Sequence, residues 1–360
     1  MVSANYYPVM GGVETHIHEV APRMVEAGVD VTVLTTDRTG TLPTREEIRG
    51  VTIRRVPAWP RDRDFYLAPH VYRAIRRGRW DVIHCQGYHT FVPPIGMLAA
   101  LRSGTPYVLT FHSGGHASAM RNRVRGLQRA ALRPLLARAS RLIAVSRFEA
   151  VLFQRALRLP ADRFVTIPNG ASLPRAEGPL EGPDDAHPLV LSVGRLERYK
   201  GHHRVIEAFP HVLRQVPGAR LRIAGSGPYG HELRALVGRL GLADQAEVRA
   251  VDPGDREGMA ALLTRARLVV LLSEYEANPV AVMEALGLGR PVLAADTSGL
   301  RDLAEDGLLE AIPRESTTEQ VAAAIVGHLR APERQIEVAL PTWDGCTRAL
   351  LDVYRSVTRA

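Results

Sequence analysis

The sequence has one lysine, four asparagines and two cysteines among its 360 residues. The two cysteines, Cys85 and Cys346, are too few for a disulfide framework or a zinc ribbon. No run of about 18 apolar residues occurs, so we expect no transmembrane helix. The first dozen residues have neither the basic nor the apolar region of a secretory signal. We therefore expect a cytoplasmic protein.

The single lysine, Lys200, is unusual because the other 45 basic residues are all arginines. A coding bias against A-rich codons would explain why both lysine and asparagine are scarce. Under such a bias, arginine would serve wherever any cation suffices. The lysine ammonium is a compact point charge that a planar guanidinium does not imitate. The scarcity therefore predicts a specific role for Lys200.

Positive charge is concentrated in the first half of the chain. Residues 1–170 contain 24 basic and 12 acidic residues, whereas residues 171–360 contain 22 and 26. A basic surface can bind nucleic acid, an anionic membrane or a phosphorylated ligand. No nucleic-acid-binding motif accompanies the charge, and only 6% of the residues are aromatic. We therefore expect no nucleic-acid partner.

Short apolar runs alternate with helix-length segments along most of the chain. Runs such as PYVLTF and ARLVVLLS are typical of strands in parallel sheets that are covered on both faces. One core rarely serves more than roughly 250–300 residues, so we expect two doubly wound domains with ligands beyond the carboxyl ends of the strands. Only three residues precede Ala4, so we expect a short first strand.

The stretch 174–188 is rich in proline, glycine and acidic residues and indicates a linker. It would separate an N-terminal domain, residues 1–173, from a C-terminal domain, residues 189–340. We expect residues 341–360 to form a helix that packs back on the N-terminal domain.

Two glycine-containing segments are candidates for phosphate binding. Gly11 and Gly12 open a helix, where backbone N–H groups can approach a phosphate, although a tight turn without a ligand is an equal alternative. In the second domain, Arg195 and Lys200 lie on the loop after the first strand and could bind a diphosphate. Two solvated surface cations are the alternative there.

A third candidate follows the strand ARLVVLLS. Pro279 suits the first turn of a helix, which places Glu276 and Asn278 at the helix N-terminus and Glu284 about a turn and a half inside. Carboxylates accept hydrogen bonds from vicinal sugar hydroxyls. An isolated pair of this kind is more often a capping acid and a solvated glutamate. His112 ends the strand PYVLTF, at the sheet edge where ligands bind, although a lone histidine is more often structural.

The segment Gly225–Gly230 matches the G-x-G-x-x-G pattern of dinucleotide-binding proteins. That signature needs an acidic residue about 20 residues further on, at the end of the next strand, and Asp252 could serve. The motif lies in the middle of an α/β series and does not follow a first strand. An NAD-dependent oxidoreductase is therefore a remote alternative.

In their order along the chain, these segments resemble the motifs of glycosyltransferase family 4, the retaining transferases with the GT-B fold. The matching segments are GGVETH, TFHSGGH, AVSRFE, IPNG, VGRLERYKG, RIAGSGP, SEYEANPVAVMEALGLGRPV and the closing helix. Glu276 and Glu284 have the spacing of the family's E-x7-E motif. One departure lies at residues 251–255, where the usual glycine near the base pocket is missing, and this leaves the nucleotide open.

The resemblance implies two Rossmann-like, doubly wound parallel-sheet domains that face each other across a cleft. It implies retaining transfer of a hexose or N-acetylhexosamine from a nucleoside-diphosphate sugar to a hydroxyl of a small-molecule, glycan or lipid-linked acceptor. A UDP-sugar is favoured and GDP-mannose is next, with no metal and no cofactor. A non-catalytic nucleotide-sugar-binding protein on the same fold is the alternative, and it would be expected to have lost the residues that bind phosphate.

The resemblance also implies roles for individual residues. Arg195 and Lys200 would bind the diphosphate and stabilise its charge, Glu276 would hold sugar hydroxyls, and His112 would hydrogen-bond the transferred sugar. Glu284 would bind the ribose. Further donor contacts would come from Gly11, Gly12, Gly225, Asn278, Pro279 and Val280.

The basic residues between Arg121 and Arg163 include a segment of mixed helical character. Its arginines alternate with leucines, which is the pattern of a basic amphipathic helix at a membrane surface. A solvated, arginine-rich face is the alternative. The residues concerned are Arg121, Arg123, Arg125, Arg129, Arg133, Arg138 and Arg141, among Leu127, Leu132, Leu135 and Leu136.

Overall fold

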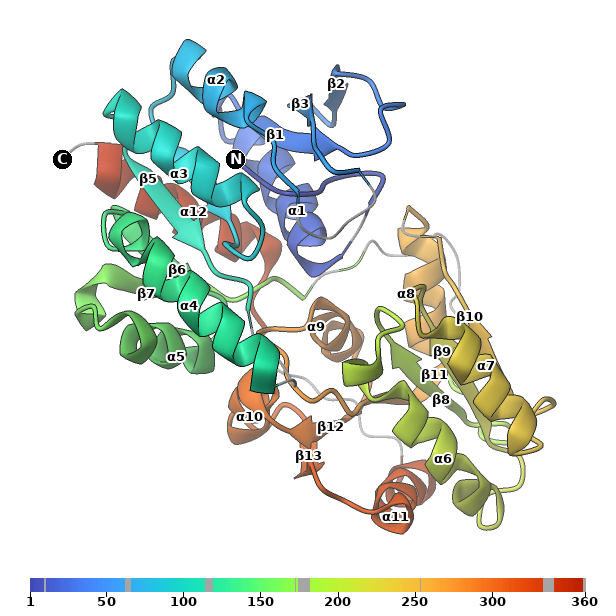
Figure 1. Ribbon diagram of the computed structural model, residues 1–360. Coiled ribbons are helices and arrows are strands. Elements are labelled where there is room, and N and C mark those ends of the chain that lie inside the picture. The colour runs from blue at the N-terminus through green and yellow to red at the C-terminus, as the bar shows by residue number, and fades with distance from the viewer. Residues whose placement is uncertain are drawn as a thin grey trace. The chain divides into compact units, whose positions relative to one another are not determined.

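The structure is a computed structural model that describes residues 1–9, 11–61, 66–113, 119–171, 173, 182–252, 254–332 and 340–358, with the backbone alone for 119–125. The described residues form two compact units (Figure 1). Unit 1 contains those of Met1–Ser113, Ser118–Asn169 and Pro341–Ala360, and unit 2 contains those of Gly170–Leu340. Residues 174–181 of the expected linker lie outside the described residues.

The sheet of unit 1 is parallel except at one edge. Its strands are β1 (Thr32–Asp37), β2 (Arg45–Ile48), β3 (Val51–Pro57), β4 (Ile83–Gln86), β5 (Tyr107–Thr110), β6 (Arg141–Ala144) and β7 (Phe164–Thr166). They are ordered β2-β3-β1 and β4-β5-β6-β7, and β2 runs antiparallel to β3. Val2 forms parallel bridges to Leu34 in β1 and Cys85 in β4. The first strand is therefore a single bridged residue that joins the two halves of the sheet.

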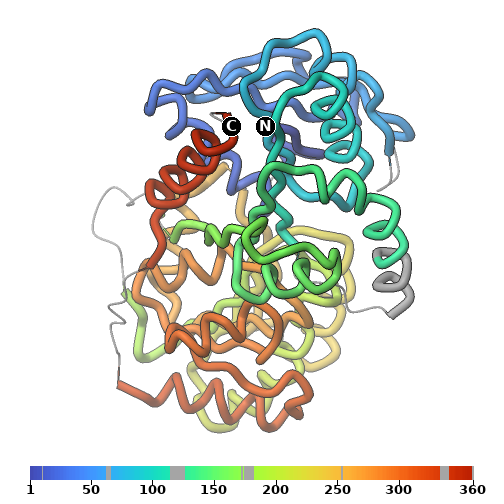
Figure 2. The backbone as a smooth tube through the Cα atoms, turned by 90° about the vertical axis from the view of Figure 1, so that its left-hand side faces the viewer, coloured from blue at the N-terminus to red at the C-terminus, as the bar shows by residue number. Residues whose placement is uncertain are grey.

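The helices of unit 1 include the last helix of the described chain. They are α1 (Gly12–Glu26), α2 (His70–Arg77), α3 (Val92–Ser103), α4 (Ala119–Leu136), α5 (Arg147–Leu157) and α12 (Trp343–Thr358), with the 3-10 turn η1 (Ala161–Arg163). Helix α12 packs against α1, and Arg23 Nε donates to Asp344 Oδ1 at 2.8 Å. Figure 2 shows the red coil of α12 beside the blue segments of this unit.

The sheet of unit 2 is entirely parallel. Its strands are β8 (Leu189–Val193), β9 (Arg220–Ala224), β10 (Ala246–Arg249), β11 (Ala266–Leu271), β12 (Val292–Asp296) and β13 (Glu310–Pro313), in the order β10-β9-β8-β11-β12-β13. The helices are α6 (His202–Leu213), α7 (Gly230–Arg239), α8 (Arg256–Arg265), α9 (Val280–Gly287), α10 (Ser298–Glu305) and α11 (Thr318–Arg330), with the turn η2 (Arg198–Lys200).

The strand order of unit 2 reverses direction between β8 and β11. In sheets of this kind, ligands bind beyond the carboxyl ends of the strands at that reversal. The central strands are buried because helices cover both faces, and Val190, Val270 and Leu293 belong to one apolar core cluster. The fold therefore points to the loops that follow β8 and β11.

Candidate active site

Two loops approach each other closely at the reversal point of unit 2. One runs from Gly194 to Gly201 after β8, and the other precedes α9 after β11. Gly201 has a φ of 73°, in the left-handed region that favours glycine. A Cβ atom on Gly201 would also overlap the carbonyl oxygen of Leu272. The absence of a side chain at this position lets the turn that carries Lys200 lie against the second loop.

Lys200 and Glu276 form an ion pair between these loops. Lys200 Nζ donates to Glu276 Oε1 at 2.5 Å, and Ser273 Oγ donates to the same oxygen at 2.8 Å. The side chains are only 14% and 10% exposed. The backbone N–H of Glu276 donates to Ser298 Oγ at 2.6 Å. The structure thus brings together two residues that the sequence singled out separately, and it adds two serines that the sequence analysis missed.

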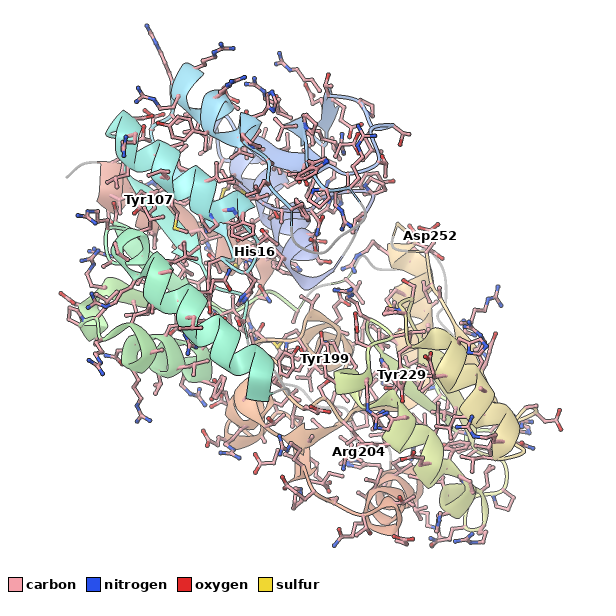
Figure 3. The ribbon with its side chains drawn as sticks, viewed as in Figure 1. His16, Tyr107, Tyr199, Arg204, Tyr229 and Asp252 are labelled. Carbon is pink, nitrogen blue, oxygen red and sulfur yellow. The ribbon has the colours of Figure 1, made fainter. Side chains whose placement is uncertain are left out.

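A stacked pair of tyrosines lies next to Lys200. The rings of Tyr199 and Tyr275 stack with 4.5 Å between centroids and 12° between planes, and Lys200 Nζ lies 5.5 Å from the Tyr199 centroid. Burial, with a smaller contribution from Glu276, raises the pKa of Tyr199 to about 12. Figure 3 labels Tyr199 among the side chains of unit 2. Tyr199 directly precedes Lys200 in the sequence, and Tyr275 directly precedes Glu276. This adjacency is the signal by which both tyrosines could have been predicted as site residues.

Arg195 lies on the same loop as Lys200 but has a different environment. Its side chain is exposed, and Nη2 lies 3.2 Å from Glu197 Oε1. The carbonyl oxygen of Arg195 lies 3.2 Å from His202 Nε2, and His202 Nδ1 lies 2.9 Å from Ser192 Oγ. Burial lowers the pKa of His202 to about 4, so the imidazole is neutral and Nε2–H donates to the carbonyl. His202, which the sequence analysis missed, therefore anchors the backbone of the loop while the Arg195 guanidinium reaches solvent.

Glu284 is paired with a cation that the sequence did not indicate. It is the fifth residue of α9 and is buried, and its Oε1 accepts from Arg256 Nη2 at 2.6 Å. Arg256 is the first residue of α8, and Asp255 caps that helix by accepting from the N–H of Gly258. Asp252, in the same connection, accepts from the N–H of Gly254 at 2.8 Å. Arg256 follows the segment 251–255, where the sequence departs from the family pattern.

The remaining predicted donor residues of unit 2 lie at two strand–helix junctions. Asn278 and Pro279 are buried directly before α9, Pro279 is the N-cap residue, and Val280 is the first helical residue. Gly225 follows β9, and a Cβ atom there would overlap the carbonyl oxygen of Gly194. This close approach of two backbones is a packing reason for glycine at position 225.

In unit 1, the two predicted glycines lie at the start of α1. Gly11 is the N-cap residue, and its carbonyl oxygen accepts from the N–H of Thr15 at 2.8 Å. Gly12 is exposed, and a Cβ atom there would have no heavy atom within 4 Å. The helix N-terminus is therefore open at Gly12. Gly114, Gly115 and His116 of the TFHSGGH segment lie outside the described residues.

His112 lies two residues beyond β5 with a φ of 53°. Its Nε2 is 2.7 Å from Gln86 Oε1, and its ring lies edge-on to His16 with 4.9 Å between centroids. Burial, and then the neighbouring His16, His84 and His89, lower the pKa of His112 well below its ordinary value. The imidazole is therefore neutral at pH 7.

The backbone beside His112 is held by a buried carboxyl group. Glu149 Oε1 accepts from the N–H of Ser113, and Oε2 accepts from the N–H of Val145 at 2.7 Å. Burial raises the pKa of Glu149 to about 8 although both hydrogen bonds oppose the shift. Glu149 thus connects the loop after β5 to the start of α5. Glu149 is the last residue of the AVSRFE segment, and no role was predicted for it from the sequence.

Within the described residues, no three His, Cys, Asp or Glu side chains gather as a metal site. Among the described helices, none has both the length and the apolarity needed to cross a membrane.

Two family models match the chain in succession. The model for "Glycosyltransferase Family 4" matches residues 10–175, and the model for "Glycosyl transferases group 1" matches residues 180–335. A D-inositol 3-phosphate glycosyltransferase of Nocardiopsis dassonvillei is 28% identical over 97% of this chain and 90% of its own length. The alpha-D-kanosaminyltransferase of Streptomyces kanamyceticus is 32% identical over 44% of this chain and 41% of its own length.

Solved structures show the same fold. Sucrose-phosphate synthase from Thermosynechococcus elongatus superposes with a TM-score of 0.76 at 20% identity, over 99% of this chain and 96% of the other. Anabaena HepE in complex with UDP and glucose superposes with a TM-score of 0.70 at 18% identity, over 99% and 97%. The α/β fold with parallel sheets is confirmed as GT-B. Together with the two family models, this likeness establishes that the chain belongs to the group 1 glycosyltransferases, GT-B enzymes that transfer a sugar from a nucleotide-sugar donor.

Proposed function

We propose that this enzyme transfers a hexose or N-acetylhexosamine from a nucleoside-diphosphate sugar to a hydroxyl acceptor, with retention of the anomeric configuration and without a divalent cation. A UDP-sugar is the favoured donor and GDP-mannose the next. The observation that carries the proposal is the Lys200–Glu276 ion pair at the reversal point of unit 2.

Each partner of this pair suits one part of the donor. The Lys200 ammonium would bind the diphosphate, where negative charge grows as the leaving group departs, and a preorganised cation there stabilises the transition state. The Glu276 carboxylate accepts hydrogen bonds and would hold sugar hydroxyls. The N–H groups at the start of α9 would add to the binding of an anion. The exposed Arg195 guanidinium would turn from Glu197 to the diphosphate.

The nucleoside would be held by Glu284. Its buried carboxylate would accept hydrogen bonds from the ribose hydroxyls. Arg256 forms an ion pair with this carboxylate, and its positive charge lowers the desolvation free energy that a buried carboxylate costs.

The transfer needs no protein nucleophile. The bond between the anomeric carbon and the phosphate oxygen breaks with its electron pair on the diphosphate, and the acceptor oxygen bonds to the same face of that carbon. The acceptor proton passes to the leaving phosphate oxygen. The neutral His112 would hydrogen-bond the sugar, and Gly11 and Gly12 would contact the donor through backbone N–H groups.

The first test combines a donor screen with metal removal. We expect thermal-shift titration to give stabilisation by UDP or GDP and none by NAD, followed by turnover of one nucleotide-sugar class with inositol phosphates among the acceptors offered. Activity should persist in EDTA because Lys200, Arg195 and a helix N-terminus supply the positive charge. Activity lost in EDTA and restored by Mg²⁺ or Mn²⁺ would overturn the metal-free mechanism. Binding without turnover of any donor would favour a non-catalytic nucleotide-sugar-binding protein.

We further propose that unit 1 contacts anionic membrane surfaces through α4. Leu136 of this helix is buried in the core of the unit and Leu132 and Leu135 are partly buried against it, whereas Leu127 is 74% exposed. A groove between α4 and α5 is lined by Arg129, Arg133 and Arg158 with no acidic residue. Side chains of Arg121, Arg123 and Arg125 lie outside the described set. Attraction would therefore be mainly electrostatic, at about 1 kcal/mol for each cation near the surface.

Vesicle co-sedimentation tests this contact. The protein should sediment with anionic vesicles, less at higher salt, and not with neutral vesicles. Replacing Arg129 and Arg158 with Glu should weaken binding, whereas replacing Arg234 and Arg239 of α7 in unit 2 with Glu should not. Equal recovery with neutral and anionic vesicles would mean that the arginines are simply solvated.

A further inference from the structure

A chain of buried polar side chains leads from α12 to His112 in unit 1. Tyr354 Oη lies 2.6 Å from His84 Nδ1, and His84 Nε2 lies 2.7 Å from Thr110 Oγ1. The amide nitrogen of Gln86 lies 3.3 Å and 3.4 Å from the two ring nitrogens of His84, and its oxygen lies 2.7 Å from His112 Nε2. Gln86 and His84 are 3% and 1% exposed. The proposed reaction assigns no role to any of these residues except His112.

The orientation of the Gln86 amide follows from its two neighbours. Both ring nitrogens of His84 already lie within hydrogen-bond distance of hydroxyl groups. The Gln86 amide nitrogen is almost equally far from the two ring nitrogens, so it lies over the face of the ring and not in line with either nitrogen. An amide N–H is attracted to the face of a neutral imidazole, whereas a carbonyl oxygen is not. The nitrogen of Gln86 therefore faces His84, and its oxygen faces His112.

This orientation decides where the proton of His112 is. The amide oxygen can only accept a hydrogen bond, so His112 Nε2 must carry the proton and donate it. A neutral imidazole has one N–H group, and its other nitrogen, Nδ1, is then an acceptor. A sugar hydroxyl would donate its hydrogen bond to that nitrogen.

We propose that Gln86 is a positioning residue that holds His112 as the Nε2–H tautomer, so that Nδ1 receives a hydrogen bond from a hydroxyl of the donor sugar. The inference rests on the proposed function, because it assumes that His112 contacts the sugar. It adds the direction of that hydrogen bond and the residue that sets it. A histidine that donates from Nδ1 would instead be suited to an acceptor atom of the sugar or phosphate.

The tautomer of His112 can be measured at neutral pH because burial and the neighbouring histidines lower its pKa, so the ring is neutral there. The titratable neighbours are His16 on α1, His84 on β4 and His89 after β4, and Glu149 binds the adjacent N–H of Ser113. We expect ¹⁵N spectra of histidine-labelled protein to show the Nε2–H tautomer for one resonance that is missing from a His112→Gln variant. The Nδ1–H tautomer at that resonance would overturn the inference without any further mutation.

Two substitutions of Gln86 give the functional test. Gln86→Leu removes the acceptor, so His112 should lose the tautomer preference and kcat should fall about tenfold, the equivalent of one neutral hydrogen bond, with KM for the acceptor unchanged. Gln86→Glu still accepts from Nε2–H, but its negative charge favours the imidazolium. Its activity should be low near pH 6 and rise with pH as His112 deprotonates, whereas Gln86→Leu should not recover. The matched control is Gln154→Leu on α5.

The outcomes separate this inference from the proposed function. If His112→Gln keeps full activity, the role of His112 in the reaction is wrong. If His112→Gln loses activity but Gln86→Leu keeps kcat within twofold and the tautomer unchanged, only the positioning role of Gln86 is wrong. Circular dichroism and thermal melts identify any variant that does not fold. In that case the tautomer of His112 in the unmodified enzyme decides whether the inference holds.

Discussion

Lys200→Ala is expected to lower kcat/KM by about 10²–10³-fold, the loss typical of removing one preorganised group that stabilises transition-state charge. Lys200 Nζ is positioned 2.5 Å from Glu276 Oε1 and 5.5 Å from the centroid of Tyr199. Its removal would leave no ammonium at this point and would leave the buried Glu276 carboxylate without its cation. Steady-state kinetics over a range of donor concentrations measure the effect.

Lys200→Arg should not restore activity. The guanidinium is larger and planar, so it would not reproduce the compact charge that Lys200 Nζ places 2.5 Å from Glu276 Oε1. Arg198→Ala is the matched control because Arg198 lies on the same 3-10 turn and has an exposed side chain, whose Nη1 donates to Tyr229 Oη at 3.2 Å. It should stay within about threefold of the unmodified enzyme, as removal of one exposed polar contact does. If Lys200→Arg were as active as the unmodified enzyme, a generic cation would suffice and the argument from the scarcity of lysine would fail.

Gly299→Ala is expected to have a second large effect, this time through the backbone. Gly299 is buried in the first turn of α10, and its N–H donates to the carbonyl oxygen of Glu276 at 2.9 Å. A Cβ atom on Gly299 would overlap the carbonyl oxygen of Ala277. The segment with Glu276 and Asn278 would have to move, at a cost of about 1–3 kcal/mol in stability. We expect kcat/KM to fall by roughly 10²-fold, since a displacement near 1 Å can cost that much.

Gly238→Ala provides the matched control in the same unit. Gly238 lies in α7, and a Cβ atom there would meet no heavy atom within 4 Å. Alanine should therefore stabilise this helix by about 0.5–1 kcal/mol and leave kinetics unchanged. Thermal melts, nucleotide binding and kcat/KM should be measured on both variants. A Gly299→Ala enzyme with unchanged kcat/KM would show that the contact between α10 and the Glu276 loop does not position the site.

The sequence was sufficient to predict the interior of both sheets. The runs PYVLTF and ARLVVLLS contain β5 and β11, whose residues are all buried, because a strand buried on both faces needs consecutive apolar residues. Strands β2 and β13 were not predicted. Each is an edge strand with partly or fully exposed side chains, as in the REEI segment of β2, and an edge strand needs no such pattern. The leucines of α4 were predicted to lie on a membrane-facing helix surface, but most of them pack in or against the core of unit 1. Their spacing alone did not distinguish these two environments.

The candidate site was predictable where a residue type was itself unusual or lay beside a strand end. Lys200 was found by its scarcity and Glu276 by its place after β11. Ser298 and Arg256, which bind Glu276 and Glu284, lie 22 and 28 residues away in the sequence and come from other helices. Only the folded chain places them in contact, and serine and arginine are too common to draw attention. Whether Gly225 also contacts the donor stays a prediction, because glycine suits both close packing and ligand approach.

The return of α12 to unit 1 has a consequence for the order in which the polypeptide becomes folded on the ribosome. The described residues of unit 2 all lie within 170–340, whereas unit 1 needs segments from both sides of that stretch. Tyr354, which bonds to His84 in β4, is made only after all of unit 2 has been synthesised. Domains generally fold as units as their residues emerge. Unit 2 can therefore be complete while unit 1, although begun first, still exposes the surface of α1 that Trp343 and Asp344 will cover. We expect proteases to cleave nascent chains mainly within unit 1 until α12 has been synthesised.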